Sequence, residues 1–458
     1  MAKRGAWRNR LLMLLAVGFF SLLIVADIMP NPFPPLWDWI NRERPIAADL
    51  EWQDRVGGRP ATALAAGETI AIDAGRAAQV RRTNDEGELI AEWTADWLTV
   101  AGTGADAVVI TGEALSRGYE VHDPGSGTKL FEDDDARAVW GFQDFRMDLR
   151  CDSLRSCELR AYQPREEQPL WRADLPGVDS SVVGVDPDLA TTVVGVPARV
   201  DDRAAGPPRR PQWIGLPIDR QRVAVIDSRT GEVMARLEPG DGELIMVVGD
   251  RVVRSVATRR DGVCVLSVTG HDLVTDTPVW GPYPYNLRTI TGGGCDQRYA
   301  AVASGLALVA VDPEGHDLVI DAGTGRVLWR GGPGDRVQGL TPEIAVVEDG
   351  EDPTVRYAVW LGGNGERLWE RTVDAEAEVM VAGCGVVVSD RDPNRIYVWD
   401  PHSGEELLSV RTGARVLACT PHGLVLADGR NIGLASFGGG SGTGERTDSD
   451  TGPGTDPR

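Results

Sequence analysis

A segment of the chain reads Asp321-Ala-Gly-Thr-Gly325-Arg-Val-Leu-Trp329, and pieces of this pattern recur along most of the sequence. The residues before and after the turn, 317–320 and 326–329, include the β-branched and aromatic types that favour strands. Asp321 can accept hydrogen bonds from backbone N–H groups two or three residues further on, and Gly325 can adopt the positive φ angle that a tight hairpin loop demands. The segment therefore predicts a strand, a tight turn and a second strand whose tryptophan packs into a core.

The same pattern occurs in three further strong copies and four weaker ones. The strong copies have their turn residues at Asp123 and Gly127, at Asp227 and Gly231, and at Asp400 and Gly404. The weaker copies lie at residues 84–93, 166–171, 276–280 and 363–369, the last with Gly365. Aligned on the turn glycine or its equivalent, the eight positions are 87, 127, 167, 231, 276, 325, 365 and 404. Most steps are close to 40 residues, which is typical of a β-propeller with one four-stranded blade per repeat. The long step of 64, from 167 to 231, contains the proline-rich residues 197–213 and predicts an inserted loop.

The repeat resembles the PQQ-binding-like (quinoprotein-like) β-propeller family, in which the third strand of a blade ends with Ala-Leu-Asp-x-x-Thr-Gly and the fourth leads to Trp. The resemblance covers roughly residues 84–437. It implies an all-β propeller fold. It leaves the function open, because the family includes quinoprotein dehydrogenases, envelope-assembly lipoproteins and other membrane-anchored proteins.

Counting the copies predicts an eight-bladed propeller over residues 84–437. Residues 414–419, 423–428 and 431–437 supply three strands after the last copy, and we expect residues 87–93 to add the fourth and close the ring. Seven blades is the alternative, if the weak copy at 276–280 belongs to an enlarged blade. Residues 29–83 are then a linker and neck with a strand at 68–73, and residues 438–458 form a disordered tail rich in Gly, Ser, Thr and Asp.

The N-terminus predicts a membrane anchor. Residues 1–10 are basic, and residues 11–28 form an apolar run that would reach roughly 27 Å as a helix, enough for a bilayer core. The flanking positive charge places the N-terminus in the cytoplasm and the propeller outside, extracellular or periplasmic in a bacterium. The alternative is a cleaved signal peptide, but no Ala-x-Ala site follows the run and no cysteine precedes Cys151.

Six cysteines fit an oxidising compartment and predict three disulfides. Residues 151 and 157 flank a hairpin tip. In each of the two later pairs the cysteines are about 30 residues apart or more, and these bonds would staple neighbouring blades. The expected pairs are Cys151 with Cys157, Cys264 with Cys295, and Cys384 with Cys419.

The remaining residues predict no catalytic, cofactor or metal site. The five histidines have no metal-ligand spacing and are expected in loops: His122, His271, His316, His402 and His422. The acidic groups at 133–135, 348–352 and 390–392 lack a calcium-loop pattern and are interpreted as solvated turns. The repeated tryptophans are interpreted as inter-blade core rather than a carbohydrate platform: Trp171, Trp280, Trp329 and Trp369. Quinoprotein dehydrogenases of the resembling family carry a disulfide between adjacent cysteines, and no two cysteines are adjacent here.

The sequence therefore favours a non-enzymatic protein without PQQ, anchored in the cytoplasmic membrane and acting as a scaffold for an envelope protein or peptide. The net charge of −22 argues against a nucleic-acid partner and favours a basic or cation-bridged one. The alternative is a quinone- or calcium-dependent extracellular enzyme, or a ligand sensor, that uses the axial pocket.

Overall fold

The computed structural model describes residues 46–47, 50–84, 86–114, 116–153, 156–176, 206–217, 222–240, 242–290, 295, 297, 301–363, 365–391 and 394–437. The chain divides into two compact units, Met1–Pro45 and Ile46–Arg458, and the described residues all belong to the second. The predicted cytoplasmic tail, transmembrane helix and C-terminal tail lie outside them. Within the described ranges, no helix has the length and apolar character needed to cross a membrane.

The described residues form nine antiparallel sheets. The first complete sheet contains β2 (Thr62–Ala66), β3 (Thr69–Asp73), β4 (Ala77–Arg82) and β5 (Leu89–Thr94). The second contains β6 (Trp97–Ala101), β7 (Val108–Gly112), β8 (Tyr119–His122) and β9 (Lys129–Asp133), with a 3₁₀ turn at Gly104–Asp106. The third contains β10 (Ala136–Gly141), β11 (Arg146–Ser153), β12 (Ser156–Tyr162) and β13 (Pro169–Pro176).

The next three sheets follow in chain order. One has three strands in the described residues: β14 (Trp213–Pro217), β15 (Val223–Asp227) and β16 (Val233–Leu237). It is followed by β17 (Glu243–Val248), β18 (Arg251–Arg260), β19 (Val263–Asp272) and β20 (Pro278–Tyr283). The sixth sheet contains β21 (Ala303–Ser304), β22 (Ala307–Val311), β23 (Asp317–Asp321) and β24 (Val327–Arg330).

The last three sheets complete the set. The seventh contains β25 (Arg336–Leu340), β26 (Ile344–Glu348), β27 (Val355–Trp360) and β28 (Arg367–Thr372). The eighth contains β29 (Glu378–Ala382), β30 (Gly385–Arg391), β31 (Asn394–Trp399) and β32 (Glu406–Arg411). The ninth has the order β1 (Trp52–Arg55), β35 (Asn431–Ser436), β34 (Gly423–Asp428) and β33 (Arg415–Thr420), so it joins strands from both ends of the described chain.

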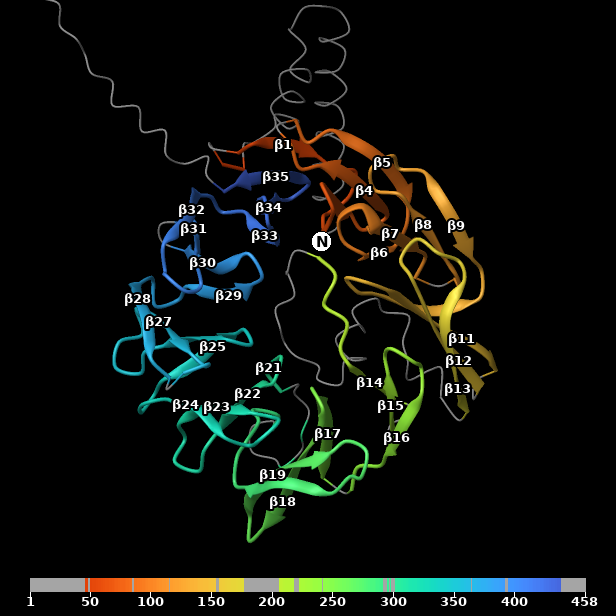
Figure 1. Ribbon diagram of the computed structural model, residues 1–458. Coiled ribbons are helices and arrows are strands. Elements are labelled where there is room, and N and C mark those ends of the chain that lie inside the picture. The colour runs from red at the N-terminus through yellow and green to blue at the C-terminus, as the bar shows by residue number, and fades with distance from the viewer. Residues whose placement is uncertain are drawn as a thin grey trace, which may run out of the picture. The chain divides into compact units, whose positions relative to one another are not determined.

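Buried apolar side chains link the nine sheets into a closed ring (Figure 1). Each of nine apolar clusters draws its residues from two neighbouring sheets, and together the clusters connect every sheet to the next. The cluster containing Trp52, Ile70 and Leu434 closes the circle between the ninth sheet and sheet β2–β5. The predicted all-β propeller is confirmed.

The blade number predicted from the repeats is wrong, because the structure has nine blades rather than eight or seven. Residues 87–93 do not complete the last sheet. They contribute to β5, the outer strand of a separate sheet whose other strands lie at 62–82, inside the predicted neck. The strand that completes the last sheet is Trp52–Arg55, which pairs with β35. The predicted composite closing blade is therefore present, but a different N-terminal strand forms it.

The repeat turns are confirmed as hairpins between the third and fourth strands. The backbone amides of Gly127, Gly231, Gly325 and Gly404 donate to the carbonyls of the respective turn aspartates at 2.7–2.9 Å. The side chains of the aspartates accept further amides, as Asp321 does from Gly323 at 2.7 Å. All these glycines, and Gly365, have φ near +70°.

A tryptophan from the preceding sheet covers most of these turn glycines. A Cβ placed on Gly325 would lie 2.7 Å from the Trp280 ring, and one on Gly404 would lie 2.7 Å from Trp369. The indole Nε1 of Trp280 donates to the Ala322 carbonyl at 2.8 Å. The four tryptophans predicted as inter-blade core are all buried, so each one packs its own blade against the next.

The three disulfides join the pairs expected from the sequence. The pair Cys384–Cys419 links the β29–β30 turn to β33, so it staples neighbouring blades as expected. Contrary to expectation, the pair Cys264–Cys295 does not join the strands of two neighbouring blades. Cys295 lies in the connection between β20 and β21, and its bond to Cys264 ties β19 to that connection.

We expect Gly325→Ala to destabilise the protein by about 2–3 kcal/mol, because a side chain there meets both an unfavourable φ and the Trp280 ring. Gly429→Ala is the matched control: Gly429 has φ +63° and no atom within 4 Å of an added Cβ. It should cost only about 1 kcal/mol. Denaturant midpoints measure the difference, and equal losses would show that the indole contact contributes nothing.

Candidate functional site

The ring has two faces with different connections. Because successive strands are antiparallel, the turns between second and third strands lie on one face, which we call the hairpin face. The turns between third and fourth strands lie on the other, the repeat-turn face. The unusual surface features of the described residues divide between these faces.

Two hairpins on the hairpin face extend beyond the first strand of their own sheets. Strand β11 pairs with β10 only as far as Arg150 but continues to Ser153. Strand β18 pairs with β17 only as far as Val256 but continues to Arg260. The two hairpins belong to the sheets on either side of β14–β16, which contact that sheet through apolar clusters.

A disulfide braces each of these hairpins. Cys151 and Cys157 lie directly opposite each other in the β11–β12 register and are buried. Cys264 near the tip of the β18–β19 hairpin is bonded to Cys295. Cross-links of this kind limit the conformations of a projecting segment.

The β18–β19 hairpin carries apolar side chains into solvent. The ladder runs without a break from Arg251↔Asp272 to Arg260↔Val263, and the turn residues Asp261 and Gly262 both have positive φ, as a two-residue hairpin turn requires. Val263 is 65% exposed and Val265 is 43% exposed. Side chains alternate between the two sides of a ribbon, so one side presents Thr258, Arg260, Val263 and Val265, which we call the valine patch.

The opposite side of the same hairpin is occupied. The Gln297 side chain donates to the carbonyls of Gly242 (2.9 Å) and Ser255 (2.7 Å), and its oxygen accepts from the Ser255 hydroxyl (2.8 Å). Cys264 is on this side and bonds to Cys295. The hairpin is therefore held from one side, and the valine patch lies on the other.

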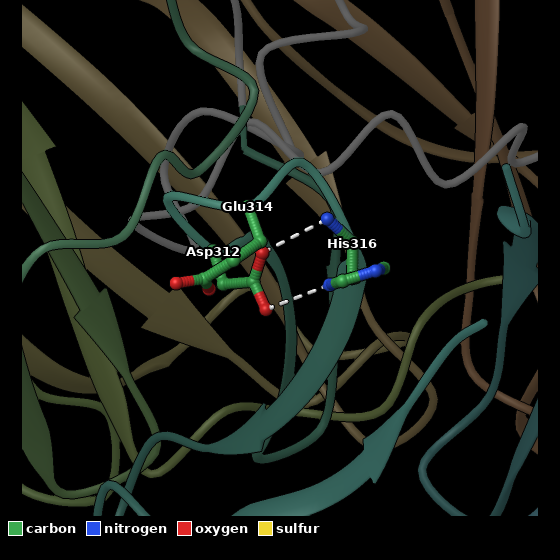
Figure 2. A group of neighbouring side chains, drawn as sticks. All are labelled: Asp312, Glu314 and His316. Atoms are coloured by element: carbon green, nitrogen blue, oxygen red, sulfur yellow. Dashed lines mark hydrogen bonds and ion pairs between the residues drawn. The ribbon is translucent and has the colours of Figure 1, made fainter. Parts of the chain in front are cut away.

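A second feature of the hairpin face is the β22–β23 turn, where one oxygen or nitrogen from each of Asp312, Glu314 and His316 lies within 4.8 Å of the others (Figure 2). The His316 amide donates to Asp312 at 2.9 Å, and its ring Nδ1 is 3.3 Å from the same carboxylate. Two carboxylates and an imidazole are a ligand set that suits Mn²⁺ or Zn²⁺. It is the one such group among the described ranges.

Arg330 already contacts all three residues of this group. Its guanidinium contacts the Asp312 carboxylate, the Glu314 carboxylate at 3.3 Å and the His316 Nδ1 at 3.1 Å. Burial alone would raise the pKa of Asp312, but the hydrogen bonds from the His316 amide and Arg330 outweigh it and hold the pKa below its usual value. In this turn a guanidinium takes the place of a metal ion and offsets one of the two carboxylate charges.

A buried polar network joins sheets β6–β9 and β10–β13. Asp148 accepts from the Tyr119 hydroxyl at 3.0 Å and pairs with Arg150 at 3.3 Å. Arg146 donates to Tyr119, and its guanidinium carbon lies 4.0 Å from the centre of the Tyr162 ring. Burial raises the pKa of Asp148, although Arg150 opposes the shift. These groups satisfy one another, which indicates a structural joint rather than a reactive site.

The repeat-turn face carries a proline-rich connection. Residues 206–212, yellow-green in Figure 1, run along the inner side of the ring to β14. The Pro208 carbonyl accepts from the Gln143 amide at 2.9 Å, and the Ser228 amide donates to the last carbonyl of the segment at 3.0 Å. This part of the predicted inserted loop contains no strand, and the rest, 197–205, lies outside the described residues.

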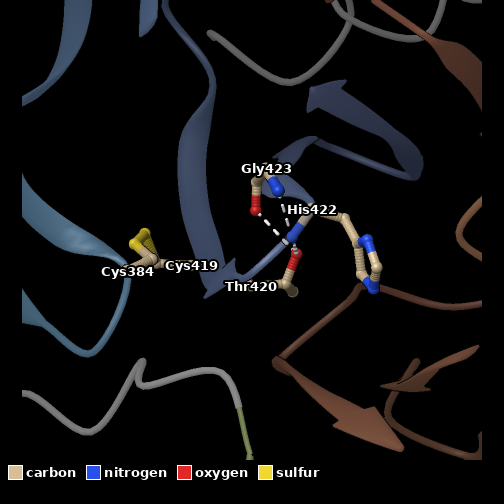
Figure 3. Close-up of a disulfide and its surroundings, with 5 residues drawn as sticks. All are labelled: Cys384, Cys419, Thr420, His422 and Gly423. Carbon is tan, nitrogen blue, oxygen red and sulfur yellow. Dashed lines mark hydrogen bonds between the residues drawn. A yellow bond between two sulfur atoms is a disulfide. The ribbon is translucent and has the colours of Figure 1, made fainter. Parts of the chain in front are cut away.

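The Cys384–Cys419 disulfide also lies toward the repeat-turn face, because it joins the β29–β30 turn to the end of β33. Figure 3 shows the disulfide and the turn that follows β33. Immediately after the disulfide, the Thr420 hydroxyl donates to the Gly423 carbonyl at 2.9 Å and accepts from the His422 amide at 3.2 Å. The hydroxyl thus fixes the turn that follows the disulfide, and His422 is a loop residue, as predicted.

The other histidines and acidic groups differ in part from expectation. The interpretation as loop residues is wrong for His122, which ends β8, and for His271, which lies in β19. The His122 side chain is buried, and the centre of its ring lies 4.1 Å from the centre of the Trp93 ring. Burial lowers the pKa of His122. The acidic group at 133–135 is not simply solvated either, because Asp133 pairs with Arg150.

Of the remaining acidic groups, the one at 348–352 forms a turn, whereas Asp390 lies in β30 and is half-buried, so the interpretation as a solvated turn is wrong for it. Asp349 accepts from the amides of Glu351 (2.9 Å) and Asp352 (3.2 Å), which closes the β26–β27 turn. Asp390 accepts from the Asp374 amide at 3.3 Å. Residue 392 lies outside the described residues.

Comparison with known proteins finds likeness in structure but not in sequence families. No protein-family model and no curated protein matches the chain. Solved structures that match include BamB from Moraxella catarrhalis, with 12% identity, TM-score 0.37 and coverage of 86% of this chain and 98% of that one. The quinohemoprotein alcohol dehydrogenase ADHIIG from Pseudomonas putida HK5 has 11% identity, TM-score 0.38 and coverage of 85% and 76%. The computationally designed Ika8 protein has 12% identity, TM-score 0.39 and coverage of 84% and 100%. Values this low carry no argument about a ligand, a reaction or a partner.

We expect Arg330→Gln to create a cation site where the wild-type chain has none, because the substitution leaves two carboxylates and an imidazole without their guanidinium. Adding about 1 mM Mn²⁺ should raise the stability of the variant by about 1 kcal/mol and leave the wild type nearly unchanged. Arg326→Gln is the control, because Arg326 is an exposed arginine in the repeat turn of the same blade, on the opposite face. Equal stabilisation of all three proteins, measured as melting temperature, would contradict the role of Arg330.

Proposed function

We propose that this protein is a non-enzymatic interaction scaffold, a β-propeller held outside the cytoplasmic membrane of a bacterium by residues 11–28. It binds an envelope protein or peptide through the hairpin face of its ring. The anchor and the location rest on the sequence, where a basic segment precedes an apolar run.

The observation that carries this proposal is the pair of disulfide-braced hairpins on one face of the ring. Both extend past the first strand of their own sheet, and one of them exposes valines. A projecting segment that is already rigid loses little conformational entropy on binding, so more of its contact energy appears as affinity.

The rest of the ring supports the role of a platform. Nine apolar clusters hold the sheets together around the circle, and the ninth sheet pairs strands from both ends of the described chain. Because the ring is closed, every blade has a neighbour on both sides, and no blade at an end of the ring is left open to aggregation. The ring also holds its connecting segments on a fixed frame.

We expect a photo-cross-linking amino acid in place of Val265 to capture a specific envelope protein in cells that express the full chain. The same replacement of Val274 is the matched control, because Val274 is also an exposed valine, at 58%, but lies in the β19–β20 turn on the repeat-turn face. Products are identified by mass spectrometry of the cross-linked peptide. Equal capture from both positions, or capture from Val274 alone, would contradict binding at the hairpin face.

We also propose that the protein uses no quinone cofactor. Native mass spectrometry of the full chain in detergent, with and without pyrroloquinoline quinone and calcium, should show no stoichiometric mass increase. A bound quinone would overturn the scaffold proposal in favour of an enzyme or a sensor that uses the ring axis.

A further inference from the structure

We infer that the valine patch of the β18–β19 hairpin binds an extended protein segment in which acidic and apolar side chains alternate. The inference deepens the proposed scaffold function by naming the chemistry of the partner. It rests on that function only for its setting in the cell, since the binding itself is a property of the patch.

The shape of the patch selects an extended partner. Arg260 is directly opposite Val263 in the ladder, and Thr258 is opposite Val265. Residues two apart on a strand point to the same side and are separated by roughly 7 Å. A segment in extended conformation has the same repeat, so its alternate side chains can each meet one side chain of the patch.

The apolar part of the patch supplies the contact energy. Val263 and Val265 are adjacent members of one side of β19, and both are largely exposed. Most other exposed large apolar residues occur once per outer strand, as Leu89, Leu130 and Leu170 do in three different sheets. Single exposed residues are ordinary on protein surfaces, whereas two neighbours at a projecting tip give a partner a continuous contact.

The charge at the tip selects an acidic partner. Arg260 is exposed on the valine-patch side and Arg259 is exposed on the opposite side, and neither forms an ion pair with another described residue. Farther down the same hairpin, Arg254 is already paired with Glu243 at 3.0 Å and Asp276 at 2.6 Å. The unneutralised positive charge is therefore concentrated at the end that carries the exposed valines.

This local charge opposes the net charge of the chain. The total of −22 favours a basic partner over long distances, but the screening length at physiological salt is only about 8 Å. At contact distance, a partner on the valine patch meets Arg260 directly and Asp261 in the adjoining turn, whereas Arg259 points to the opposite side of the ribbon with Cys264. The partner favoured at this position is therefore acidic, whereas the net charge of the whole chain favours a basic one.

We would test the inference with two labelled eight-residue peptides, one alternating valine and glutamate and one alternating valine and lysine, bound to the purified full chain in detergent. Fluorescence anisotropy should give at least about ten-fold tighter binding for the glutamate peptide, and added salt should weaken it. Arg260→Glu should abolish this preference, and Arg260→Lys should retain most of it. The double variant Val263→Ser, Val265→Ser should weaken binding about ten-fold at any salt concentration.

Val274→Ser and Arg326→Glu are the matched controls on the repeat-turn face, and thermal melting verifies that each variant is folded. Equal binding of the two peptides, no binding of either, or an equal loss in the Val274→Ser variant would overturn the inference. If the glutamate peptide binds the patch but cross-linking at Val265 captures no protein in cells, the inference stands and the scaffold function fails.

Discussion

The structure depends on one contact that is repeated around the ring, in which an aromatic side chain from the fourth strand of a blade lies on the turn glycine of the next blade. Trp280 on Gly325, Trp369 on Gly404 and Trp52 on Gly87 are examples. The indole also donates to the backbone in several blades, as Trp280 does to Ala322. This contact explains why glycine is needed twice over at these positions: it adopts positive φ, and its missing side chain makes room for the ring. Two of the turn positions, Glu167 and Asp276, are not glycine. Each follows a blade that has no tryptophan at the corresponding place, where Phe131 and Ala235 stand instead, so that place supplies no indole to cover the turn.

The same contact explains which part of the fold could be predicted from the sequence. The positions of the repeat copies could be identified in the sequence because aspartate, glycine and tryptophan occupy fixed places in the pattern. The number of blades could not be identified in this way, because the first complete sheet has only a weak copy of the pattern and the closing sheet has none of the counted copies. In the first complete sheet, the residue four places after Gly87 is Ala91, and Trp93 lies two places beyond it and stacks on His122 instead. The closing strand contains only Trp52. A signal was nevertheless present: Trp52 precedes Ala91 by 39 residues, which continues the spacing of the repeat.

The sites described above also differ in whether they could be predicted from neighbouring residues or depend on residues far apart in the chain. The long β18–β19 hairpin has a local signal, because Asp261-Gly262 lies between two strand-forming runs and such pairs are strong hairpin turns. The group at Asp312, Glu314 and His316, which contacts Arg330, has no complete local signal. Its ligand spacing is visible in the sequence, but the residue that decides its chemistry, Arg330, comes from β24. Cysteine pairing was predictable because residues 151 and 157 flank one hairpin tip, and the spacing of 384 and 419 is close to one blade.

Rigidity and recognition are therefore connected through the ring. A propeller in which every blade packs on its neighbours can carry a hairpin longer than its own sheet, since the base of that hairpin is held by β17, β20 and Gln297. Only the part beyond these supports is free to vary in sequence without loss of core packing. In this chain that part combines two arginines with two exposed valines, although the chain as a whole is strongly acidic. Screening by salt makes such a local reversal of charge effective, because distant carboxylates contribute little within a few ångströms of the tip.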